Sequence, residues 1–83
     1  MDYYLFTARS ITQAQRMAQV LEQAGMHAGV QRLPMGLSNQ GCAYGVRVNV
    51  SQYERALALV QSMGMGPLKV FVHSQAGFRE VTL

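Results

Sequence analysis

One sulfur atom is the strongest candidate for chemistry in this chain of 83 residues. Cys42 is the only cysteine, and it lies in the polar, glycine-containing stretch LPMGLSNQGCAYGVRV, residues 33–48. Gly41 removes a side chain directly before the sulfur and lets the backbone adopt torsion angles closed to other residues. We therefore expect the thiol to be accessible. The alternative is that Cys42 is a small apolar filler, which is common for a lone cysteine at the start of a strand.

An accessible thiolate can take a sulfur or selenium atom from a donor and hold it as a persulfide or its selenium analogue. Arg32 and Arg47 flank the segment that contains Cys42. We predict that these two arginines pair across a hairpin and favour the thiolate over the thiol. Backbone N–H groups in the turn Ser38–Asn39–Gln40–Gly41 are a second predicted source of positive potential.

Other kinds of site have weaker support in the sequence. Cys42, His27 and His73 have no short ligand spacing, so we predict no metal site and no cofactor. Both histidines are expected to be solvated residues at strand edges. No phosphate-binding glycine motif occurs, and the four carboxylates are too widely spaced for paired acid–base chemistry.

Composition indicates one small cytoplasmic domain that spans residues 1–83. The chain is 49% hydrophobic and 13% charged, which excludes intrinsic disorder. The formal net charge is +3, but the cations are spread evenly rather than clustered as in a nucleic-acid interface. A single cysteine cannot form an internal disulfide, and neither a signal peptide nor a membrane span is expected.

The first half of the chain predicts a strand, a helix and a second strand. Residues 2–7 are rich in aromatic side chains and indicate a strand. Residues 10–25 have helical apolar spacing, with Ser10 and Gln13 spaced as a capping box and Gly25 as the C-terminal cap. A short strand over 28–33 then ends at Pro34, and a loop follows over 35–41.

The second half repeats this pattern. Residues 43–50 alternate as a strand, and Ser51 and Glu54 have the spacing of a second capping box that begins a helix ended by Gly64. Strands are predicted over 68–72 and, after a turn, over 78–83. The order βαββαβ is that of the ferredoxin-like (split βαβ) α+β fold, an antiparallel sheet with two helices on one face. We expect the valines of residues 43–50 to face the helices, and Gly45, Arg47 and Asn49 to lie on the open face.

The stretch around Cys42 resembles the small bacterial domains of the selenium/sulfur carrier protein-like family. In that family a strand–helix–strand unit ends at a proline, a Leu-Ser pair follows, and a single cysteine enters the next strand. The matching residues occur here in the same order and are Pro34, Leu37, Ser38, Gly41 and Cys42. Ala43 replaces the usual glycine after the cysteine, and the stretch between Ser38 and Cys42 is one residue longer than usual.

The resemblance implies a stoichiometric carrier rather than an enzyme, with a protein sulfur or selenium donor and a protein acceptor as partners. It implies Cys42 as the covalent carrier. The residues that it implies for the supporting loop are Pro34, Leu37, Ser38, Asn39 and Gly41.

Two alternatives use the same fold. RNA-recognition domains share this element order and stack bases on aromatic side chains, but here Val46 and Val48 occupy aromatic positions of their third-strand signature and only Tyr44 remains. We therefore do not expect nucleic acid as a partner. The other alternative is a plain interaction module, in which the open face of the sheet pairs with a second copy or with a larger protein.

Overall fold

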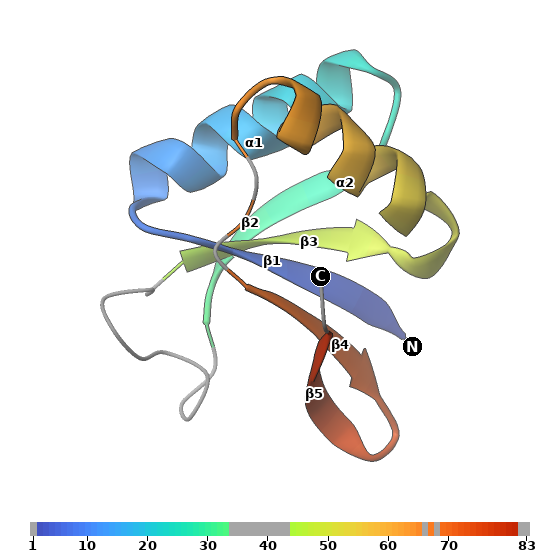
Figure 1. Cartoon of the computed structure of the whole chain (residues 1–83). Coiled ribbons are helices and arrows are strands. Elements are labelled where there is room, and N and C mark those ends of the chain that lie inside the picture. The colour runs from blue at the N-terminus through green and yellow to red at the C-terminus, as the bar shows by residue number, and fades with distance from the viewer. Residues whose placement is uncertain (1, 34–43, 66, 68, 82–83) are drawn as a thin grey trace.

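The computed structural model describes residues 2–33, 44–65, 67 and 69–81. In this part of the chain, strands and helices follow one another in the predicted order (Figure 1). The elements are β1 (Tyr3–Ala8), α1 (Ile11–Gln23), β2 (Ala28–Arg32), β3 (Tyr44–Asn49), the short 3₁₀ helix η1 (Val50–Gln52), α2 (Tyr53–Ser62), β4 (Val70–Ser74) and β5 (Gly77–Val81).

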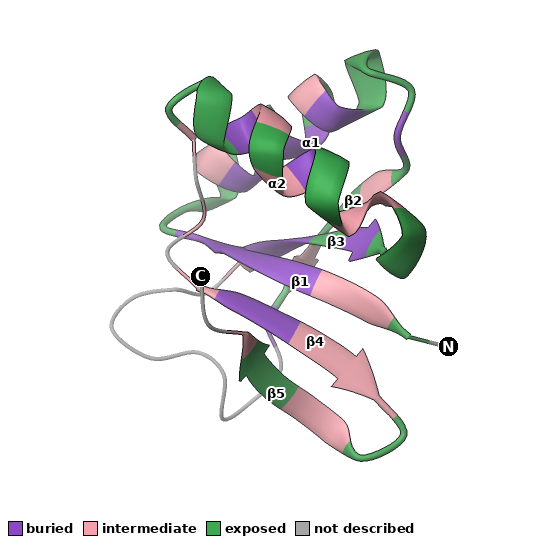
Figure 2. Ribbon diagram, turned by 45° about the vertical axis from the view of Figure 1, so that its right-hand side comes forward, coloured by how far each residue is buried: buried purple, intermediate pink, exposed green. Residues whose placement is uncertain are grey.

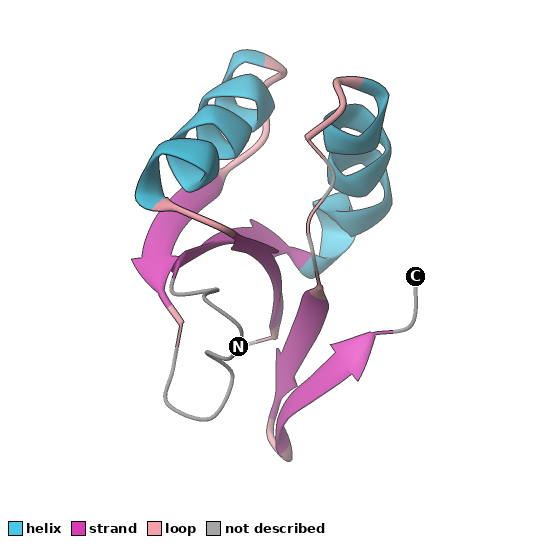
Figure 3. Ribbon diagram, turned by 60° about the vertical axis from the view of Figure 1, so that its left-hand side comes forward, coloured by secondary structure: helices cyan, strands magenta, loops and turns pink. Residues whose placement is uncertain are grey.

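The strands form one antiparallel sheet in the order β2-β3-β1-β4-β5. Both helices cover the same face of this sheet, and among the described residues no helix lies on the other face (Figures 1 and 3). Each helix connects two strands that are separated by one intervening strand: β3 lies between β1 and β2, and β1 lies between β3 and β4. This arrangement confirms the ferredoxin-like α+β prediction, with β5 added beside β4.

Helix α1 begins and ends at the predicted signals. The Ser10 hydroxyl accepts a hydrogen bond from the backbone N–H of Gln13 at 3.1 Å, and the Gln13 side-chain oxygen accepts one from the N–H of Arg9 at 2.7 Å. Two backbone donors at the helix start are thus satisfied by side chains. At the other end Gly25 has a φ of 85°, a left-handed conformation that glycine adopts without strain.

The start of α2 differs from the prediction. Ser51 lies inside η1, and the residue that precedes α2 is Gln52, whose side chain makes no capping hydrogen bond. The Gln52 side-chain oxygen instead accepts a hydrogen bond from the backbone N–H of His27 at 3.3 Å. The Gln52 side chain is therefore bonded to the residue before β2 and does not cap α2. The predicted Ser51–Glu54 capping box does not form.

The main core lies between the helices and the sheet (Figure 2). Helix α1 contributes Ala14, Met17, Ala18 and Leu21, and α2 contributes Ala56 and Val60. From the sheet, the buried side chains are those of Phe6, Ala8, Val46, Val48 and Val70. Val46 and Val48 of β3 face the helices as predicted, and Arg47 and Asn49 are exposed. The same prediction is wrong for Val50, which lies in η1 and is exposed.

A second, smaller apolar cluster lies on the opposite face of the sheet. Leu5, Leu33 and Phe71 are buried there, and Tyr3 and Phe78 pack against them. Since cross-strand partners share a face, the pairing of Leu5 with both Arg47 and Phe71 places the cluster on the side away from the helices. The open face is therefore partly apolar.

Strand β4 begins two residues later than predicted, at Val70. The buried Thr7 hydroxyl donates a hydrogen bond to the carbonyl oxygen of Lys69 at 3.0 Å and accepts one from its N–H at 2.8 Å. The Thr7 N–H donates to the same carbonyl at 2.9 Å. These bonds hold Lys69, the residue before β4, against the end of β1. Strand β5 follows β4 after a turn that ends at Gly77.

Candidate functional site

Six of the predicted site residues lie outside the described part of the chain: Pro34, Leu37, Ser38, Asn39, Gly41 and Cys42. Their predicted roles stay predictions. Arg32 and Arg47 are described, and so are the two strands that enter and leave the segment with Cys42. The described base of this site is the β2–β3 pair.

Arg32 lies where β2 leads into the segment that contains Cys42. It pairs with Tyr44, the first residue of β3, and its guanidinium carbon lies 5.9 Å from the centre of the Tyr44 ring. A guanidinium at this distance from an aromatic face has a favourable cation–π interaction. Tyr44 itself packs against the main core, so this pair is on the helix side of the sheet.

Arg47 does not pair with Arg32. Its cross-strand partner on β2 is Gly29, three positions from Arg32, and its side chain is on the open face. The guanidinium carbon lies 4.1 Å from the centre of the Tyr3 ring. Tyr3 pairs with Asn49, at the end of β3 opposite to the one that follows Ala43. The predicted pairing of the two arginines across the hairpin is therefore wrong, because an odd register offset puts them on opposite faces.

The base of the hairpin is tightly packed on its open face. A Cβ atom added to Gly45 would lie 2.9 Å from Leu33 Cδ2, 2.9 Å from the carbonyl oxygen of Phe6 and 3.1 Å from Leu5 Cδ1. Because Gly45 has no side chain, Leu33 can lie directly over β3. Leu33 is the last described residue before the segment that contains Cys42, and its packing over Gly45 holds Leu33 against β3.

An aromatic group extends over the open face next to Arg47. The Tyr3 and His73 rings stack with centroids 4.7 Å apart, and Phe78 meets both of them edge to face. His73 is half-buried on β4, which lies between β1 and β5 in the sheet, so the expectation of a solvated residue at a strand edge is wrong for it. The two-residue period of a strand could have predicted this burial, because it places His73 on the same face as the apolar Phe71.

This geometry bears on the RNA-recognition alternative. Tyr44 packs on the helix side, so it is not on the face that such domains use to stack bases. Tyr3 is on the open face, but His73 stacks on its ring and the Arg47 guanidinium also lies over it. The described part of the sheet thus has no aromatic ring on β3 facing away from the helices.

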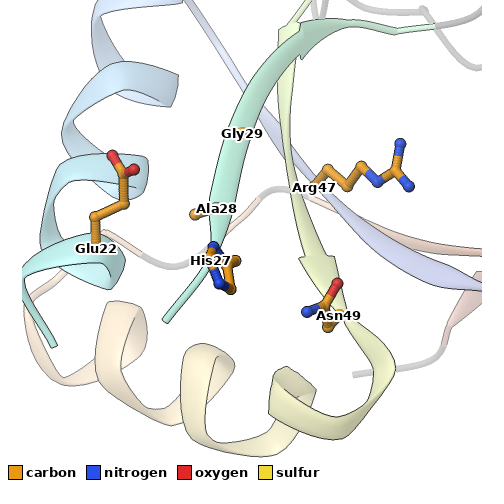
Figure 4. Close-up of a pocket in the computed structure, with 6 residues that line it drawn as sticks. All are labelled: Glu22, His27, Ala28, Gly29, Arg47 and Asn49. Atoms are coloured by element: carbon orange, nitrogen blue, oxygen red, sulfur yellow. The ribbon is translucent and has the colours of Figure 1, made fainter. Parts of the chain in front are cut away.

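A shallow pocket of about 190 Å³ surrounds the start of β2 (Figure 4). Glu22 of α1 lies on one side of the strand, and Arg47 and Asn49 of β3 lie on the other. His27, Ala28 and Gly29 complete the lining. No three His, Cys, Asp or Glu side chains come together as metal ligands among the described residues.

Residues 3–72 match the family described as "Putative Se/S carrier protein-like". The chain belongs to this family. The matched range includes both helices, strands β1 to β3 and Cys42, and it confirms the resemblance that the residues around the cysteine carry. No curated protein and no solved structure matches the chain. Among the described helices of this Se/S carrier-like chain, none is long and apolar enough to cross a membrane.

Proposed function

We propose that this chain is a sulfur or selenium carrier that holds the transferred atom on Cys42. The match of residues 3–72 to the Se/S carrier-like family is the observation that carries the proposal. The chain contains no other thiol that could hold the atom. It acts in the reducing cytoplasm as a stoichiometric participant without a cofactor.

The transfer is a pair of thiol exchanges. The Cys42 thiolate attacks the terminal sulfur of a persulfide on a donor protein, a new S–S bond forms at Cys42, and the donor's own thiolate leaves. A thiolate on the acceptor protein then attacks the terminal sulfur on Cys42, and the Cys42 thiolate leaves. Each step breaks one S–S bond and forms one, so no external oxidant or reductant is required.

The described residues support a positioning role for Arg32 rather than for Arg47. Arg32 is an exposed, positively charged residue at the strand end that leads into the Cys42 segment. We propose that it favours the Cys42 thiolate and the persulfide anion, together with backbone N–H groups of residues 38–41. The contact of Arg47 with Tyr3 gives no support to the same role.

Intact-mass measurement after incubation with a cysteine desulfurase and cysteine tests the proposal. We expect the folded chain to gain the mass of one sulfur atom, and the Cys42→Ser variant to gain none. If the folded chain stays unmodified while a known acceptor is modified in the same tube, the carrier proposal is wrong. That result would favour an interaction module of the same fold.

The rate of thiol alkylation against pH tests the role of Arg32. We expect a midpoint below the ordinary cysteine pKa of about 8.5, raised in Arg32→Gln. Arg79→Gln is the matched control, because Arg79 is an exposed arginine on β5 and its change should leave the midpoint where it is. Equal midpoints in the wild type and Arg32→Gln would refute this role.

A further inference from the structure

The two outer strands of the sheet differ in how they are protected against pairing with another strand. β5 is the outer strand on one side, and it has adjacent exposed charges, Arg79 and Glu80. β2 is the outer strand on the other side, and its centre is uncharged, with Gly29 and Val30 exposed. Charged side chains on an edge strand oppose edge-to-edge pairing, whereas a small or apolar edge invites it. In the described part of the chain, β2 has a strand partner only on its β3 side.

We propose that β2 pairs with β2 of a second copy of this chain, antiparallel and about a twofold axis at Val30. This continues the sheet across both copies. The register places Val30 opposite Val30, Gly29 opposite Gln31 and Ala28 opposite Arg32, so all five residues of the strand are paired. A twofold axis makes the contact isologous, the form that closes as a dimer.

Charge complementarity favours a second copy over another partner. Ala28 and Arg32 pair with Val48 and Tyr44 of β3, and both of those side chains pack on the helix side. Glu22 of α1 lies beside Ala28 on that same side and lines the same pocket (Figure 4). Where Ala28 of one copy meets Arg32 of the other, the Arg32 guanidinium therefore comes next to the Glu22 carboxylate of the copy that contributes Ala28.

The twofold axis repeats this contact, which gives two ion pairs placed symmetrically about Val30. Within each copy the ion pair found among the described residues joins Lys69 and Glu80, so it uses neither Glu22 nor Arg32. The space beside Gly29 is empty in the single chain, since a Cβ atom placed on Gly29 would meet no atom within 4 Å. Nothing described at this position obstructs a second strand. Val30, 37% exposed in the single chain, becomes covered by its symmetry mate. The proposal does not depend on the chemistry of Cys42.

Sedimentation equilibrium of the whole chain over a range of concentrations tests the proposal. We expect the mass to rise towards twice the 9.2 kDa of one chain. Val30→Lys places two like charges opposite each other and should weaken the dimer by about tenfold or more. Met63→Lys is the matched control, since Met63 is 57% exposed and follows α2, the helix that leads to β4, which β3 and β1 separate from β2; it should dimerise like the wild type.

A charge exchange tests the register itself and covers the case in which Val30→Lys does not fold. Glu22→Arg and Arg32→Glu should each weaken the dimer, and the double variant should restore it. A wild type that stays monomeric at all concentrations would overturn the proposal and leave this edge to an extended segment of another protein. Loss of dimerisation in the double variant as well, with a native circular dichroism spectrum, would overturn the register.

Discussion

Gly45→Ala is the substitution whose outcome the structure fixes most sharply. In an ordinary strand this change is stabilising by about 0.5–1 kcal/mol, because glycine loses more backbone entropy on folding than alanine does. At Gly45 the new methyl group would lie 2.9 Å from the Phe6 carbonyl oxygen and within 3.1 Å of two leucine side chains. The leucine side chains can shift, but the Phe6 carbonyl belongs to the central strand of the sheet and cannot.

We therefore expect Gly45→Ala to reduce the free energy of unfolding by about 1–3 kcal/mol, the usual effect of overpacking. For a domain of this size each kcal/mol lowers Tm by roughly 4–8 °C. Urea and thermal unfolding followed by circular dichroism suit a chain without tryptophan. The matched control is Gly29→Ala on the neighbouring strand, where a methyl group meets no atom within 4 Å; we expect it to be neutral or stabilising by up to about 1 kcal/mol.

The two variants are compared at a protein concentration low enough to keep the chains monomeric, because Gly29 lies in the proposed β2–β2 contact and association would affect the two variants differently. The reasoning fails if Gly45→Ala is as stable as Gly29→Ala or more stable. Such a result would mean that β1 and β3 separate enough to admit a methyl group, and that Leu33 does not depend on the missing side chain.

Four further substitutions test the hydrogen bonds and the ionisation described above. Thr7→Val leaves the Lys69 N–H without its acceptor, and we expect urea unfolding to show a loss of about 1–3 kcal/mol. Ser10→Ala removes the cap of α1 and should cost about 1 kcal/mol, whereas Ser51→Ala, which caps no helix, should cost less than about 0.5 kcal/mol. Burial, then Tyr4 and Glu54, raise the pKa of Tyr53 above its ordinary value of 10.0. Stability should therefore be unaffected by Tyr53 below pH 10 and fall as the pH rises further, and Tyr53→Phe should remove part of that alkaline loss.

Each of these expectations has a contrary result. A Thr7→Val chain as stable as the wild type would mean that water satisfies the Lys69 N–H. Equal losses from Ser10→Ala and Ser51→Ala would place a cap on α2 after all. An alkaline loss of the same size in Tyr53→Phe would assign it to other groups.

Much of the fold follows from local signals in the sequence. The capping pair Ser10–Gln13 and the glycine after α1 act within one helical turn, so their spacing predicts the helix directly. The alternation over residues 43–50 predicts which face of β3 meets the helices, because side chains on a strand have a period of two. The element order then leaves few topologies for the sheet.

The errors concern interactions between residues far apart in the chain. Ser51 and Glu54 have the spacing of a capping box, yet the residue before α2 is Gln52, which accepts a hydrogen bond from the N–H of His27. The two residues are far apart in the sequence, so no local pattern predicts this bond. The register of β2 on β3 decides that Arg32 and Arg47 lie on opposite faces, and this register cannot be counted from the sequence while the loop between the strands has unknown geometry.

The place of β1 in the sheet also determines when this chain can fold. Its neighbours are β3 and β4, so β1 is synthesised before both of its partners, which begin at Tyr44 and Val70. Until then Tyr3, Tyr4, Leu5 and Phe6 have no sheet to join, and a nascent chain exposes them. The central strand of the sheet therefore has both of its neighbours only after residues 70–74 have been synthesised.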